Sequence, residues 1–226
     1  MPFIAAFLLV LLGALPATAQ VAPTEAELRA YRGLHAAAAR GDVADLEKQI
    51  AAGENREAPD DRHRTPLHVA VYQEQHDAAR ALIRLGADPN KLDIDRYDII
   101  TIAAVANDLP MLKLSIEGGG NPKAITSRYD GTALIAAAHL GHADVVRMLI
   151  AARAPLDHVN NLRWTAVIES IVLGDGGKNH TDTLRALVDA GANVNIADGS
   201  GSTPLKLAKN RGYREMVMIL EKAGAK

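Results

Sequence analysis

The sequence lacks cysteine and is poor in aromatic residues. Without cysteine, a disulfide framework, a lipid-attachment site and thiolate chemistry are all excluded. Hydrophobic residues make up 48% of the 226 residues but aromatic residues only 4%, so a core must be built mainly from Ala, Leu, Ile and Val. That composition favours many small, closely packed helices over an aromatic-rich sheet.

An excess of charge of one sign is lacking as well. The chain has 25 basic and 27 acidic residues, a net charge of −2. A protein that binds nucleic acid gains most of its affinity from a basic surface, so we expect no nucleic-acid partner. The length is sufficient for one or two domains with a sizeable core.

Charged side chains are absent from residues 1–20, MPFIAAFLLVLLGALPATAQ. The apolar run from Ile4 to Leu15 is too short for a bilayer core, which needs about 20 residues. A proline and a small-x-small pattern follow the run. These features predict a cleavable signal peptide, residues 1–19, cut between Ala19 and Gln20. The Lys or Arg that usually precedes the apolar run of a signal peptide is missing. The alternative is that this segment forms a buried N-terminal helix.

The remaining chain repeats itself about every 33 residues. One position of the repeat holds Thr65, Asp98, Thr132, Thr165 and Thr203, at spacings of 33, 34, 33 and 38. A first copy, RGLHAAAA, begins at residue 32. Repeats of this length predict a solenoid of stacked supersecondary units. The six predicted units are residues 24–60, 61–93, 94–126, 127–159, 160–197 and 198–226, and together with the preceding residues they form one domain, 20–226.

Each unit has the same internal plan. A helix follows the capping threonine, a turn comes next, and a second helix carries apolar residues in fixed columns and ends near a glycine. The third unit departs most from the plan, because Asp98 replaces threonine, Pro110 lies near the start of its second helix and EGGGNP (117–122) follows. We therefore expect it to be the softest interior unit.

Several motifs resemble the ankyrin-repeat family: TPLHVA (65–70), GHADVVRMLI (141–150), GADPN (86–90) and GANVN (191–195). This resemblance implies an all-α repeat solenoid of six helix-turn-helix units with short β-hairpins. It also implies that His35 and His68, in the family's histidine column, hydrogen-bond the neighbouring hairpin. The segments RYDGTALIAAAHLGHADVV and WTAVIESIVLGDGG resemble a group of exported bacterial ankyrin proteins more narrowly.

The glycine-rich run IVLGDGGKNHTDT (171–183) raises the possibility of a phosphate loop. A Walker loop needs Gly, four residues and then Gly-Lys-Ser/Thr between a strand and a helix, and this run does not match. Alignment with the fourth unit instead makes Asp175–Asn179 five extra residues in the turn between two helices. A weak anion site of glycine amides beside Lys178 stays open.

Metal and catalytic chemistry have little support in the sequence. His139 and His142 are three residues apart, but His142 fills the Gly-His turn position of the repeat, and HExxH is absent. We expect no metal, no cofactor and no catalytic residues. Glu169 is unusual, since it occupies a column that is otherwise apolar, and it belongs to a surface or to the edge of the binding groove.

Arginine lies beside a large aromatic residue near several hairpin tips, a composition typical of protein interfaces. The predicted partner-binding residues are Arg62, Arg64, Asp95, Arg96, Tyr97, Arg128, Tyr129, Arg163, Trp164 and Glu169. The alternative for Tyr97 and Trp164 is that they only pack between hairpins.

The sequence thus predicts a non-enzymatic scaffold or adaptor that is exported to a bacterial periplasm or secreted. It would bind another protein through the concave hairpin and inner-helix face, as a monomer and without membrane insertion after cleavage. One alternative is a secreted effector that binds a host or competitor protein. Another is an enzyme or metal site built on the Asp175–Asn179 loop.

Overall fold

The computed structural model describes residues 21–226. They form 13 α-helices, of which the first, α1 (Glu25–Ala30), precedes six helix-turn-helix pairs. The inner helices of the pairs are α2 (Gly33–Arg40), α4 (Pro66–Tyr72), α6 (Ile99–Val105), α8 (Ala133–Leu140), α10 (Ala166–Val172) and α12 (Pro204–Arg211). The outer helices are α3 (Val43–Ala51), α5 (His76–Arg84), α7 (Leu109–Glu117), α9 (Ala143–Ala151), α11 (Lys178–Asp189) and α13 (Arg214–Lys222).

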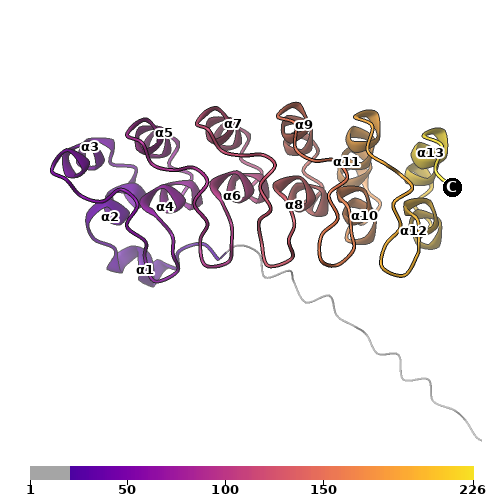
Figure 1. Ribbon diagram of the computed structural model, residues 1–226, viewed down its shortest axis with the longest axis horizontal. Helices are drawn as coiled ribbons and strands as arrows, with labels where there is room; N and C mark the ends of the chain where they lie inside the picture. The colour runs from indigo at the N-terminus through magenta and orange to yellow at the C-terminus, as the bar shows by residue number, and fades with distance from the viewer. Residues whose placement is uncertain (1–20) are drawn as a thin grey trace, which may run out of the picture.

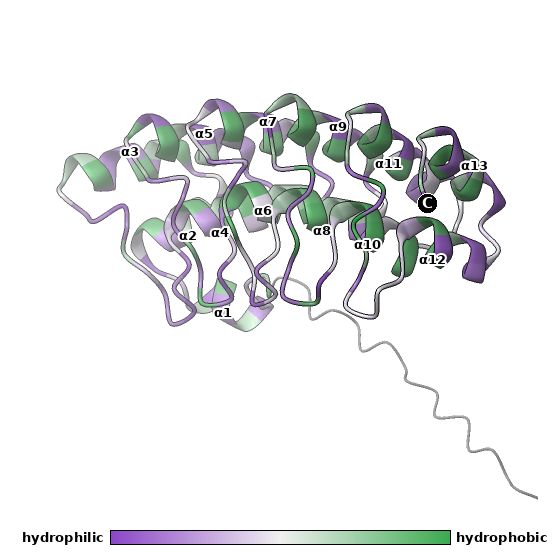
Figure 2. Ribbon diagram, turned by 45° about the vertical axis from the view of Figure 1, so that its right-hand side comes forward, coloured by the Kyte–Doolittle hydropathy of each residue, from purple (hydrophilic) through white to green (hydrophobic). Residues whose placement is uncertain are grey.

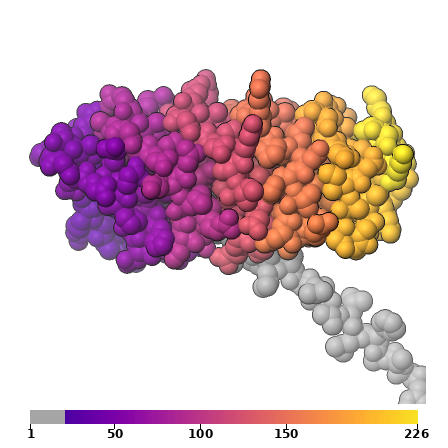
Figure 3. Space-filling model, in the orientation of Figure 1, coloured from indigo at the N-terminus to yellow at the C-terminus, as the bar shows by residue number. Residues whose placement is uncertain are grey.

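The pairs stack in chain order into an elongated array (Figures 1 and 3). Inner helices pack on inner helices of the next pair, and outer helices on outer helices, so two layers run the length of the molecule. The six-unit, all-α solenoid predicted from the repeat is confirmed. The predicted signal peptide lies outside the described residues. Among residues 21–226, no helix is long and apolar enough to span a membrane.

Small side chains fill the space between the layers. Ala37, Ala38, Ala70, Ala104 and Ala138 are completely buried in the inner helices, which lets neighbouring helices approach closely. In the outer-helix column predicted from the repeat, Leu46, Ala79, Leu112, Val146 and Leu184 are completely buried, and Val217 of the last unit is half-buried. Figure 2 shows most of the hydrophobic residues on the helices, whereas the connecting loops alternate hydrophilic and hydrophobic stretches. The last unit exposes Glu221, which gives the end of the stack the polar surface that solubility requires.

The repeated threonine begins the inner helices as an N-cap. The side chains of Thr65, Thr132, Thr165 and Thr203 each accept a hydrogen bond from the backbone N–H three residues later, which satisfies a free donor of the first turn. Asp98 does the same in the third unit, at 2.8 Å from the Thr101 N–H. Burial raises the pKa of the Asp98 carboxyl group. The expectation that the third unit is the softest interior unit stays a prediction.

The loops between pairs follow the path of hairpins, but they do not form the paired strands that were predicted. Within residues 21–226 the only strand-like pairing is a single bridge between Thr126 and Gly131. In the loop of Asp60, the side-chain Oδ1 accepts the N–H groups of Arg62 and Arg64, both at 2.8 Å. Asn160 repeats this arrangement. A side chain therefore supplies the bonds that a second strand would otherwise make.

Backbone hydrogen bonds join successive loops edge to edge. The N–H of Ile94 donates to the Arg62 carbonyl and that of Asn161 to the Tyr129 carbonyl, both at 2.9 Å. A third bond, between Ser127 and Arg96, has the same length. Four consecutive loops are thereby held in a fixed row beside the inner helices.

The extra residues 175–179 do not all bulge from the turn as predicted. Helix α11 begins at Lys178, so Lys178 and Asn179 lengthen the helix and only three residues lie in the turn. Gly176 has φ +72°, and a Cβ built on it would lie 2.4 Å from the Tyr213 ring. The Gly177 N–H donates to Asp175 at 2.8 Å. The turn thus packs against the last unit, and the Asp175 side chain already accepts a hydrogen bond from one of the turn's amide groups.

Candidate protein-binding surface

Exposed hydrophobic side chains gather on the loops. We define the hairpin surface as the exposed side chains of residues 59–64, 91–97, 123–131 and 159–164. Of the nine large hydrophobic residues that are exposed within residues 21–226, five lie here, between 38% and 51% exposed. They are Leu92, Ile94, Ile125, Tyr129 and Leu162. Since burying such side chains is favourable, an exposed group of them marks a candidate interface.

Ion pairs between neighbouring loops order the charged side chains of the hairpin surface. Asp95 accepts hydrogen bonds from Arg62 at 2.9 Å and from Arg128 at 2.6 Å. Arg96 donates to Asp130 at 2.9 Å. Exposed pairs of this kind add little stability, but they reduce the side-chain freedom that binding would otherwise have to remove.

The remaining exposed residues of the predicted set lie at the loop tips. Arg163 is exposed and has φ +64°, and Arg96 is similar at +67°. Tyr129 is exposed, whereas Trp164 is only half-buried, with its backbone N–H bonded to Asn160. These side chains are available to a partner together with the hydrophobic ones.

Three residues of the predicted set are buried and do not reach the surface. Arg64 is 1% exposed, and Tyr97 and Glu169 are also buried. Tyr97 packs in the hydrophobic core, which fits the alternative that it packs between hairpins. Arg64 and Tyr97 therefore do not belong to the contact surface.

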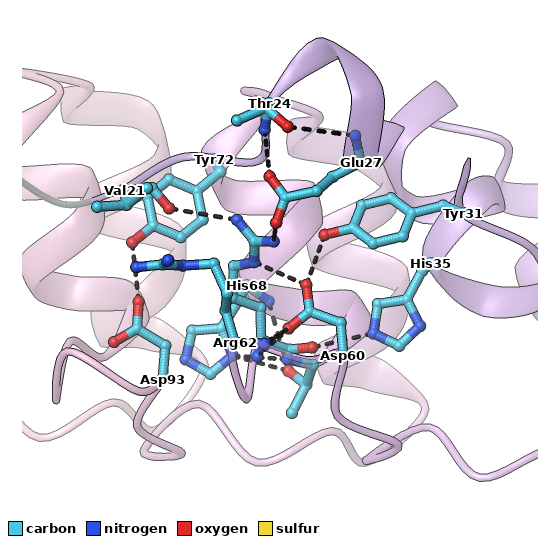
Figure 4. Close-up of polar contacts among 12 residues, drawn as sticks. Val21, Thr24, Glu27, Tyr31, His35, Asp60, Arg62, His68, Tyr72 and Asp93 are labelled. Carbon is cyan, nitrogen blue, oxygen red and sulfur yellow. Dashed lines mark hydrogen bonds and ion pairs between the residues drawn. The ribbon is translucent and has the colours of Figure 1, made fainter. Parts of the chain in front are cut away.

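Figure 4 labels Val21, Glu27, Tyr31 and Asp60, which belong to a polar network that the sequence did not reveal. Arg64 joins them. Its guanidinium donates to Asp60 at 2.7 Å, to Glu27 of α1 and to the Val21 carbonyl. The Tyr31 hydroxyl donates to Asp60 at 2.6 Å. The capping box of Thr24 and Glu27, which could be found in the sequence, is present. The network fastens the N-terminal segment to the first two units.

Hydrogen bonds with the surroundings determine the pKa values in this network. Burial alone would raise the pKa of Asp60, but the Tyr31 hydroxyl and the backbone and guanidinium of Arg64 outweigh burial and lower it. The pKa of Glu27 is lowered chiefly by the Thr24 backbone, with a contribution from Arg64. Both carboxyl groups are therefore ionised in the folded protein at neutral pH.

The histidines bind the loops, as the resemblance implied. His35 Nε2 donates to the Arg64 carbonyl at 2.9 Å, and His68 Nε2 donates to the Lys91 carbonyl at 3.0 Å. Burial lowers the pKa of His68, so its ring is neutral and its Nδ1 accepts from the Thr65 N–H. The expectation for His35 and His68 is confirmed.

Residues 21–226 contain no group of three His, Cys, Asp or Glu side chains placed to hold a metal ion. His142 uses Nδ1 to donate to the Ala104 carbonyl at 3.1 Å, so it bonds the preceding unit. One open hollow, of about 240 Å³, lies between the loops and is lined by Glu57, Pro59, His63, Thr65, Lys91 and Leu92. The geometry of this part of the chain thus presents a row of loops rather than an enclosed reaction site.

Comparisons with known proteins agree with this geometry. The family model for ankyrin repeats (3 copies) matches residues 10–93 and 100–198. The ankyrin repeat protein YahD of Escherichia coli K12 is 32% identical over 84% of this chain and 94% of its own length. The crystal structure of an ankyrin repeat domain, ABAYE2397 of Acinetobacter baumannii, has a TM-score of 0.82 and 42% identity, covering 85% of this chain and 98% of that one. The ankyrin repeat protein EF0377 has a TM-score of 0.79 and 30% identity, covering 85% and 98%.

Ankyrin repeats generally bind proteins, and their fold is non-catalytic. The six stacked units, the bonded loops and these matches agree with one another. The chain belongs to the ankyrin-repeat family.

Proposed function

We propose that this protein-binding scaffold is an exported adaptor that binds a protein partner with its hairpin surface and the adjoining inner helices. One observation carries the proposal: five exposed hydrophobic side chains stand in a row of loops in which Arg62, Arg96 and Arg128 are already held by ion pairs. Binding would bury those side chains without reorganising the loops. A rigid, preformed surface loses little conformational entropy on association.

The charge of the hairpin surface indicates the chemistry of the partner. Its cations outnumber its anions over all four loops. The exposed or half-buried cations are Arg62, Lys91, Arg96, Lys123, Arg128 and Arg163, and the anions are Asp60, Asp61, Asp95 and Asp130. A partner with acidic groups around an apolar patch would complement this surface. Such complementarity raises the rate of association and makes it sensitive to salt.

Export is the second part of the proposal. The uncharged apolar start of the chain, the small-x-small pattern before Gln20 and the resemblance of two segments to exported bacterial ankyrin proteins support it. Cleavage at that point would leave the N-terminal segment, from Val21 onward, free to bind Arg64. The adaptor would then act in the periplasm.

One experiment in intact bacteria tests both parts. A photo-reactive benzoylphenylalanine placed at Tyr129 should cross-link a partner, because this side chain is exposed on the hairpin surface. The same group at Met218, which is 63% exposed on α13, is the matched control and should give no adduct. The adduct should be recovered from the periplasmic fraction, and mass spectrometry of its chain should show Gln20 as the first residue.

The outcomes separate the alternatives. Adducts from Met218 but not Tyr129 would place the interface on the outer helices and contradict the proposed surface. An uncleaved chain in the cytoplasm would contradict export, and an adduct only in the medium or in a recipient cell would favour the secreted effector.

A further inference from the structure

Glu169 lies buried in the middle of α10, where the other units have Ala36, Val69, Ile102, Ala136 and Leu207. It is only 4% exposed. Its Oε1 accepts a hydrogen bond from the Asn160 side chain at 3.0 Å, but its buried Oε2 has no hydrogen-bond partner. A buried carboxylate oxygen without a donor is costly, so its presence requires an explanation.

His139 of α8 is the neighbour that connects this carboxylate with solvent. Its Nδ1 lies 3.5 Å from Oε2, and its side chain is 31% exposed. The ring makes no hydrogen bond with any of residues 21–226, because the bond from His180 goes to the His139 backbone carbonyl. The imidazole can therefore turn away from Glu169 without breaking a hydrogen bond.

Two exposed leucines lie at the C-terminal ends of the same two helices, α8 and α10. Leu140 follows His139, and Leu173 lies four residues after Glu169, on the same face of the chain as it leaves α10. The two leucines are 33 positions apart and hold the same place in adjacent units, whose helices α8 and α10 pack together. Both are exposed. The inner-helix layer thus holds, in two adjacent units, a buried carboxylate and two exposed apolar side chains.

Within residues 21–226, His139 is the only basic side chain that approaches Glu169 within ion-pair distance. Asn160 is held by its Oδ1, which accepts from the Leu162 and Trp164 N–H groups, and its amide donates to Oε1. Apart from His139, no side chain of residues 21–226 offers a donor to Oε2, which leaves this oxygen available to a donor from a partner.

We propose that Glu169 is a recognition site for one cationic side chain, lysine or arginine, of the partner, which enters when the His139 ring turns aside. The ammonium or guanidinium group donates to Oε2, and its alkyl stem packs against Leu140 and Leu173. The proposal rests on the proposed function only because the cation is taken to come from the protein partner. The partner would thus carry two kinds of contact: a cationic side chain that the inner helices bind, and acidic and apolar groups that face the hairpin surface.

The site can be tested without the partner. N-propylguanidinium is titrated into the folded mature protein and followed by NMR at the His139 ring and the methyl groups of Leu140 and Leu173. We expect saturable shifts at these three residues, and none with N-propylurea, its neutral counterpart. Glu169→Gln keeps the acceptor for Asn160 but removes the charge, and should weaken binding about tenfold or more. Glu117→Gln, an exposed carboxylate on α7, should bind the probe like the wild type.

A second variant tests the role of His139. His139→Ala exposes the carboxylate, and we expect it to bind N-propylguanidinium more tightly than the wild type. Equal shifts with the charged and neutral probes, or equal binding by Glu169→Gln, would overturn the proposal, as would the absence of any saturable shift. If Glu169→Gln fails to fold, the comparison of the two probes on the wild type decides. None of these results depends on the hairpin surface, so the cross-linking experiment can succeed or fail independently.

Discussion

Replacing Arg64 with methionine is expected to lower the free energy of unfolding by about 3–5 kcal/mol. The guanidinium is almost completely buried and is the only cation that contacts Asp60 and Glu27 within residues 21–226. Methionine would fill part of the space but leave two carboxylates close together without a counter-charge. The Tyr31 hydroxyl, which donates to Asp60, cannot compensate for both.

Arg62→Met is the matched control, two residues away in the same loop. Arg62 is part-exposed and binds Asp95, which keeps its second arginine, Arg128. Its loss should cost less than about 1 kcal/mol. Urea denaturation of both variants measures the difference, and hydrogen exchange should show α1 and the first unit opening first, because each unit is stabilised by its neighbours. Equal losses for the two variants would show that Arg64 is not the centre of the network.

The same network predicts how stability depends on pH. The pKa values of Asp60 and Glu27 are lowered in the folded protein, so their stabilising effect is complete above the unfolded values of about 4. It is lost as the pH falls through the lower, folded values. The stability difference between the wild type and Arg64→Met should therefore shrink below about pH 4. A difference that stays constant from neutral to acid pH would contradict this account of the pairs.

The repeat register could be predicted from the sequence because each unit repeats the same local physics. Thr65 caps a helix, His68 bonds the next loop, and both follow from the position within the unit. The six helix pairs required nothing from distant residues. The burial of Arg64 was not predictable in this way, because it depends on Glu27, which lies outside the repeating pattern.

The contact surface was harder to predict for a different reason. A search for arginine beside aromatic residues found Arg128 and Tyr129 but missed Leu92, Ile94 and Leu162. The aligned units could have indicated one column, since Pro59, Leu92, Ile125, Val159 and Ala197 hold the same place in successive loops. The exposure of these residues depends on how each loop turns. The turn is directed by hydrogen bonds to the Asp60 and Asn160 side chains, which cannot be inferred from amino-acid composition.

The proposed surface itself predicts a large effect on binding. Replacing Tyr129 and Leu162 together with alanine should weaken partner binding about 100-fold or more, since central apolar anchors each contribute about 2 kcal/mol or more. Both side chains are exposed in the free protein and lie outside its buried core. The double variant should therefore keep the helicity and the unfolding midpoint of the wild type, as seen by circular dichroism.

The most direct test measures the affinity of the cross-linked partner, once identified, for the Tyr129→Ala/Leu162→Ala and Met218→Ala variants by titration calorimetry. Met218 is more exposed than either hairpin residue but lies on α13, so its replacement controls for the loss of an exposed hydrophobic side chain. The account predicts affinity lowered about 100-fold for the hairpin variant and unchanged for Met218→Ala. Unchanged binding by a folded hairpin variant, with loss only for Met218→Ala, would contradict it.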